Sequence, residues 1–129
     1  MNNYFSDERV EKALTQMAAL LDEPTPVFSD GYDKLPHDAA MGRVYGRTRH
    51  DQQAEWNTQQ TASLRSLGGV VRHRAMHIAR GMPLEIGWFP NMDLGLSDNC
   101  DRLAARLYQQ GLSVEEVVEG VADLIRKRA

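Results

Sequence analysis

Two histidines, His73 and His77, lie four residues apart in a segment with helical character. This spacing places both rings on one helical face, as in zinc proteases that carry a glutamate beside the first histidine. Arg74 occupies the glutamate's position here, and its guanidinium neither acts as a base nor tolerates a nearby cation. A third ligand would have to come from a distant residue: His37, His50, Asp51 or Cys100. We therefore predict surface histidines, with no metal site and no cofactor.

The single cysteine, Cys100, is predicted on the apolar face of a helix between Asp98 and Asp101. Neighbouring carboxylates disfavour the thiolate that a nucleophile needs, so the sequence favours a small core residue. A lone cysteine also indicates a reducing, cytoplasmic setting. Carboxylate pairs such as Glu115 and Glu116 diverge on a helix and do not form an acid–base couple. We expect no enzyme activity, although a small enzyme with a site assembled from scattered residues stays open as an alternative.

The arginines carry the sharper functional prediction. Residues 41–80 hold seven arginines and two acidic residues, whereas residues 1–40 and 81–129 are each net acidic. Arg65, Arg72 and Arg80 recur every seven or eight residues and would line one side of a helix for about 22 Å. A row of this kind fits an anionic surface, either an acidic protein or a nucleic acid. The competing interpretation is neutralisation by the chain's own acidic ends.

The candidate partner-binding residues therefore combine this row with the arginines before it and one tryptophan, a residue type enriched at interfaces. They are Arg43, Arg47, Arg49, Arg65, Arg72, His73, Arg80 and Trp88. We expect a non-enzymatic cytoplasmic regulatory or inhibitory module, of the kind that phages and mobile elements also carry. Its partner would be a macromolecule with an anionic surface.

Residues 107–118 resemble the opening of helix-turn-helix domains, in which Gly-Leu-Ser ends one helix and Glu-Glu-Val begins the next. The resemblance implies a DNA-binding regulator, commonly a dimer, whose following helix enters the major groove. Only nine residues follow Gly120, which leaves barely two helical turns for recognition. This function is the second hypothesis.

The first helix is predicted from Ser6, a good N-cap, to the residues before Pro24. Phe5 and Val10 have the spacing of a hydrophobic staple. One apolar stripe then repeats at helical spacing: Val10, Leu14, Met17 and Leu21. Such a stripe packs either within the chain or against a second copy, so a homodimer stays open.

A long connection, residues 24–50, precedes a second helix over residues 51–82. Its inner arc is predicted to contain six apolar residues: Leu64, Leu67, Val71, Ala75, Ile78 and Met82. We predict that Arg65, Arg72, His73, Met76 and Arg80 project from the opposite arc. Gly68 and Gly69 cost about 2 kcal/mol relative to alanine, so close helix crossing, a kink or a break must compensate. The sequence favours a kink or a break.

Residues 83–97 form a second connection with apolar side chains that we expect to cover the core as a lid. They are Ile86, Trp88, Phe89, Met92 and Leu94. The third helix should begin at Ser97 or Asp98 and end before Gly111. The fourth should begin at Ser113, which forms a capping box with Glu116.

The whole chain of 129 residues has a net charge of −3 and 42% hydrophobic residues, which is typical of a globular protein. Neither a signal peptide nor a membrane-spanning segment is expected. The sequence therefore predicts a single mainly α domain over residues 1–129. It should be a small bundle of four to five helices with two long irregular connections.

Overall fold

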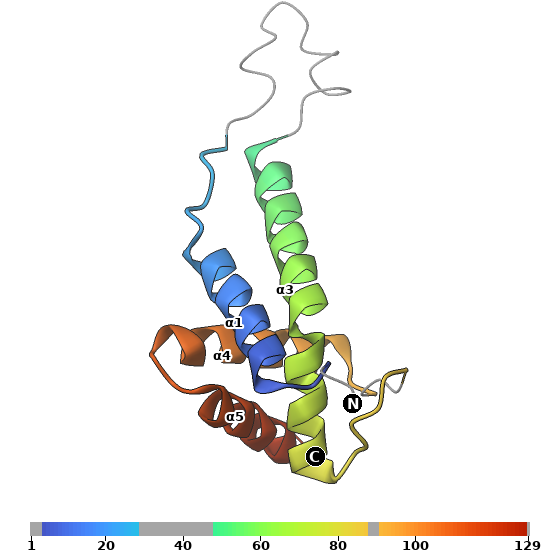
Figure 1. The fold of residues 1–129 in the computed structure, drawn as a ribbon. Helices are drawn as coiled ribbons and strands as arrows, with labels where there is room; N and C mark the ends of the chain where they lie inside the picture. Colours follow the sequence, from blue (N-terminus) through green and yellow to red (C-terminus); the bar gives the residue numbers. More distant parts are fainter. Residues whose placement is uncertain (1–3, 29–47, 88–90, 129) are drawn as a thin grey trace, which may run out of the picture. The chain divides into compact units, whose positions relative to one another are not determined.

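The computed structural model describes residues 4–28, 48–87 and 91–128, which form four α-helices and no strand. The helices are α1 (Asp7–Asp22), α3 (Arg49–Arg80), α4 (Leu94–Gln109) and α5 (Val114–Lys127), shown in Figure 1. The prediction of a small, mainly α bundle is confirmed. Within the described residues, none of these helices has the length and apolarity needed to cross a membrane.

The chain divides into two compact units. The core unit combines Met1–Glu23 with Ser63–Ala129, and the second unit is Pro24–Ala62. The second unit contains the first part of α3, where the Thr48 side chain accepts a hydrogen bond from the Asp51 N–H at 3.0 Å. The single-domain organisation stays a prediction.

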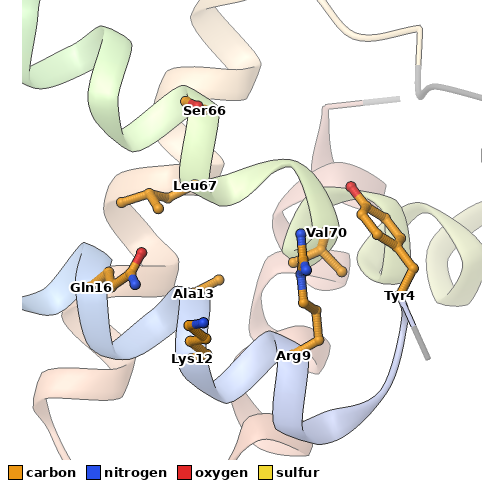
Figure 2. Close-up of a pocket in the computed structure, with 8 residues that line it drawn as sticks. All are labelled: Tyr4, Arg9, Lys12, Ala13, Gln16, Ser66, Leu67 and Val70. Carbon is orange, nitrogen blue, oxygen red and sulfur yellow. The ribbon is translucent and has the colours of Figure 1, made fainter.

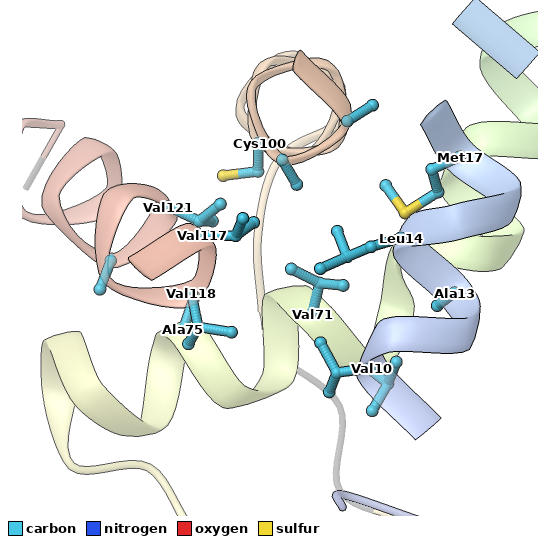
Figure 3. Close-up of a cluster of buried hydrophobic side chains, with 14 of the residues drawn as sticks. Val10, Ala13, Leu14, Met17, Val71, Ala75, Cys100, Val117, Val118 and Val121 are labelled. Carbon is cyan, nitrogen blue, oxygen red and sulfur yellow. The ribbon is translucent and has the colours of Figure 1, made fainter. Parts of the chain in front are cut away.

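Apolar side chains from all four helices meet in the core unit (Figure 3). Leu14 of α1, Cys100 of α4 and Val117 of α5 are completely inaccessible to solvent, and Val71 of α3 nearly so. The apolar stripe of α1 is thus buried inside the chain, against α3, α4 and α5. Each aliphatic side chain buried in this way stabilises the fold by about 1.5 to 3 kcal/mol.

The predicted helix caps of α1 and α5 are confirmed. Ser6 caps α1 by accepting a hydrogen bond from the Arg9 N–H at 3.2 Å. At the start of α5, the Ser113 hydroxyl accepts from the Glu116 N–H at 3.2 Å, and the Glu116 carboxylate accepts from the Ser113 N–H at 3.0 Å. The hydrogen bond from the Ser113 backbone, followed by that from its side chain, lowers the pKa of Glu116 below its ordinary value.

Replacing Ser113 with alanine should lower the free energy of unfolding by about 1 kcal/mol, because it removes one half of the capping box. Thermal or urea denaturation measures the change. Ser113→Asp supplies the control, since an aspartate cap also accepts from the N3 amide and should retain most of the stability. Equal losses in both variants would contradict a capping role.

The predicted start of the third helix, at Ser97 or Asp98, is wrong. α4 begins at Leu94, and its cap is Asp93, whose carboxylate accepts a hydrogen bond from the Leu96 N–H at 2.8 Å. Ser97 is buried one turn further into the helix. The sequence contains several polar residues that could cap this helix. The helix begins at the one whose side chain reaches a free backbone N–H, which is Asp93.

Of the predicted kink or break at Gly68–Gly69, the break is wrong, because α3 is helical without interruption from Arg49 to Arg80, and the kink stays a prediction. A Cβ atom at Gly68 would lie 2.8 Å from Cγ of Asp101 on α4 and 3.0 Å from Nη1 of Arg72. Gly68 therefore allows α4 to approach α3 closely, as the alternative of close helix crossing predicted. At Gly69 the nearest atom to such a Cβ is 3.9 Å away.

Candidate functional site

Arg72, the centre of the predicted arginine row, points into the molecule. Its guanidinium donates through Nη1 to the carboxylate of Asp101 and through Nη2 to the Arg65 carbonyl oxygen at 3.1 Å. The side chain of Arg72 is 14% exposed and that of Asp101 is 1% exposed. The expectation that Arg72 projects into solvent is wrong, because the approach of α4 at Gly68 brings a carboxylate over it.

The buried carboxyl of Asp101 has an unusual pKa. Burial raises the pKa of Asp101 from 3.8 to about 6, against the opposing influence of the neighbouring Arg72 guanidinium. Nearby Asp98 adds to the increase, and Arg65 acts in the opposite direction. The charge of Asp101 therefore changes in the mildly acidic range, which makes the contact between α3 and α4 sensitive to pH.

Other arginines of α3 are also partly engaged by the protein itself. Arg74 donates through Nη1 to the Asp7 carboxylate at 2.6 Å. Arg65 is half-buried, and its Nε atom has no solvent contact. The competing prediction of internal neutralisation thus holds for Arg72 and Arg74, whose partners come from the two acidic ends of the sequence.

The two histidines hold the chain that leaves α3. His73 donates through Nε2 to the Pro83 carbonyl oxygen at 2.9 Å, and its ring lies edge-on against Phe5 with the centroids 4.6 Å apart. His77 donates through Nδ1 to the Met82 carbonyl oxygen at 2.6 Å. The predicted exposure of His73 is wrong, since it is 4% exposed, and Met76 is buried as well. Within the described residues no group of three potential ligands could hold a metal ion.

Cys100 is a core residue, as the sequence predicted. Burial, together with the neighbouring charge of Asp101, raises the pKa of the Cys100 thiol to about 11. The side chain is therefore a neutral thiol at physiological pH. Its packing among valines of α5 accounts for its place in the structure.

The segment before α4 differs from the predicted lid. Ile86 is 68% exposed and Leu94 is 66% exposed, so neither covers the core, whereas Met92 packs against it. The candidate residues Arg43, Arg47 and Trp88, and the predicted lid residue Phe89, lie outside the described residues. Arg49 is exposed at the start of α3, in the second unit.

The neighbouring ends of α3 and α5 carry exposed cations that the sequence did not indicate as one set. The Arg126 guanidinium of α5 donates to the Ile78 carbonyl oxygen of α3 at 3.4 Å, so the last turns of these helices lie side by side (Figure 1). Arg80 in the last turn of α3, and Lys127 and Arg128 at the end of α5, are all exposed. We call these three residues the basic end.

The charges of the basic end are uncompensated within the described part of the chain. Arg126 itself is neutralised by Asp123 at 2.7 Å and lies 3.9 Å from Glu119. No carboxylate among the described residues lies within ion-pair distance of Arg80, Lys127 or Arg128. The basic end therefore carries three exposed positive charges at the ends of two neighbouring helices.

The rest of the exposed face of α5 is acidic, and it bears on the resemblance to helix-turn-helix domains. Four carboxylates are exposed along this helix: Glu115, Glu116, Glu119 and Asp123. A helix that enters the major groove passes between two phosphate backbones, which would repel such a face. The exposed carboxylates therefore disfavour insertion of α5 into the major groove.

Sequence reasoning missed the basic end because it explained the C-terminal cations by the helix dipole alone. Arg80 and Lys127 are 47 positions apart, and only the packing of α5 against α3 brings the ends of their helices together. Only the position of cations in the last turns of two neighbouring helices could have indicated it. No family model, curated protein or solved structure matches the chain.

Proposed function

We propose that the protein is a non-enzymatic regulatory or inhibitory module that binds the acidic surface of a larger protein through its basic end. The proposal is supported by the contact between the last turns of α3 and α5, where Arg80, Lys127 and Arg128 are exposed without compensating carboxylates in the described chain. Arginine suits this contact because its planar guanidinium binds carboxylates through two parallel hydrogen bonds.

Affinity capture from the native host tests the proposal, with the full chain as bait and nuclease treatment in one arm. We expect one protein partner that survives nuclease and is lost when Arg80→Glu and Lys127→Glu are combined. Each lost charge pair at an interface should weaken binding and increase its sensitivity to salt.

Arg106→Glu is the matched control, because Arg106 is an exposed arginine of α4 that does not belong to the basic end. It should retain the partner. Loss of the captured material on nuclease treatment would identify a nucleic-acid partner instead. Equal capture by the wild type and the double variant would show that the basic end is not the binding surface.

A further inference from the structure

An open groove runs between α1 and residues 63–70 of α3, within the core unit (Figure 2). It consists of two adjoining hollows of about 270 and 470 Å³, both of which contact Gln16, Ser66 and Leu67. Arg9, Lys12 and Tyr4 line the first hollow, and Ala19, Leu20 and Glu23 line the second. The groove is thus basic at one end, acidic at the other and largely uncharged between them.

The residues that α1 contributes to the groove are arranged symmetrically about Gln16. Arg9 and Glu23 are each seven residues from Gln16, which corresponds to about 10 Å along the helix. Lys12 and Leu20 are each four residues away, and Ala13 and Ala19 are three. At 100° per residue, all of them lie within about 60° of the direction of Gln16.

The charged groups of the groove lack ionic partners in the described chain. The Arg9 guanidinium lies 5.0 Å from the centre of the Tyr4 ring, and neither Arg9 nor Lys12 has a carboxylate within ion-pair distance among the described residues. Glu23 likewise has no cation within that distance there. Asp22 differs, because its carboxylate accepts a hydrogen bond from Gln109 at 2.9 Å.

We infer that this groove binds α1 of a second copy of the chain, antiparallel and with the two-fold axis beside Gln16. An antiparallel copy places Glu23 of the second copy opposite Arg9, and the symmetric contact repeats the pair. Leu20 of the second copy then enters the first hollow. The aliphatic part of its Lys12 covers the second hollow, with the ammonium directed outward.

The groove accommodates a helix for steric reasons as well. Ala13 and Ala19 flank Gln16 at equal distances, and their small side chains allow two helix backbones to approach closely. Leu67 and Leu20, both half-buried in the single chain, would lose their remaining exposure in the dimer. This interface uses none of the residues of the basic end.

Sedimentation equilibrium of the full chain at low salt tests the inference by an exchange of charges. Arg9→Glu alone places two carboxylates opposite each other at both symmetric contacts, and Glu23→Arg alone places two cations there. Each variant should raise the dimer dissociation constant about tenfold or more. An equimolar mixture of the two should form a heterodimer, because both contacts again join opposite charges.

Matched controls change the same charges elsewhere. Glu11→Arg alters the side of α1 about 140° from Gln16, and Arg106→Glu alters α4; both should leave dimerisation unchanged. Ala19→Arg, a substitution at an exposed site, should prevent dimerisation by steric obstruction. A monomeric wild type, a dimer retained by both charge reversals, or a mixture that fails to associate would each overturn the inference.

Discussion

Replacing Arg72 with methionine is expected to lower the free energy of unfolding by about 3 to 5 kcal/mol near neutral pH. The substitution leaves the Asp101 carboxylate buried without its cation, and an unpaired buried charge is strongly destabilising. The side chain of Asp101 is only 1% exposed, so water cannot compensate for the lost guanidinium. Chemical denaturation at several pH values measures the effect.

The loss of unfolding free energy caused by Arg72→Met should be smaller in acid, because of the pKa of Asp101. In the folded wild type that pKa is raised to about 6, above the ordinary 3.8, so the native state binds the proton more tightly than the unfolded chain. The contribution of Asp101 to stability is therefore complete below about pH 4 and is lost as the pH rises through 6. Without Arg72 the pKa of Asp101 should rise further.

The double variant Arg72→Met/Asp101→Asn provides the control. Because it removes the carboxylate together with the guanidinium, no buried charge is left unpaired, and most of the stability near neutral pH should return. The free energy of unfolding of this double variant should also lack the change between pH 4 and 6 that Asp101 causes in the wild type. A single Arg72→Met variant as stable as the wild type near neutral pH would contradict the buried ion pair.

Gly68→Ala should lower the free energy of unfolding by about 3 kcal/mol, whereas Gly69→Ala should raise it by about 0.5 to 1 kcal/mol. At Gly68 the new methyl group would overlap Asp101, whose short buried side chain cannot move away. At Gly69 the methyl group meets nothing closer than 3.9 Å, and alanine gains its usual advantage within a helix.

These adjacent positions control for each other, because both lie in the same uninterrupted helix and undergo the same chemical change. Urea denaturation monitored by circular dichroism gives both values. If the two substitutions shifted stability in the same direction by similar amounts, the close approach of α4 to Gly68 would not exist as described.

The sequence predicted the ends of α1 and α5 well because their caps are local. Ser6 and Ser113 contact amides three residues away, so the residue types alone indicate the boundary. The apolar stripe of α1 was equally easy to recognise in the sequence, since α1 has one buried side. These features depend on few long-range contacts.

The surroundings of α3 could not be predicted in the same way. A helical wheel assumes one buried arc and one exposed arc. In the core unit, however, α3 buries Val71 on one side and His73 and Met76 on the other. The partner of Arg72 lies 29 residues away on α4, and only the tertiary packing brings it there.

The roles of the individual arginines of α3 also depend on tertiary packing, so the sequence indicates them only in part. The sequence singles out the arginines of the central helix and also indicates internal neutralisation as the alternative, which holds for Arg72 and Arg74. Which arginine is used internally depends on where α4 and α5 contact α3. Arg72 lies under α4, whereas Arg80 extends past the contact with α5.

We conclude that the Arg72 guanidinium is held inside the molecule, whereas those of Arg80 and Arg128 are exposed to solvent. Modification of the native protein with phenylglyoxal, followed by mass spectrometry of each arginine over time, tests it most directly. We predict early modification of Arg80 and Arg128, and protection of Arg72 until the protein is unfolded. Modification of Arg72 as rapid as that of Arg80 in the folded protein would contradict the claim.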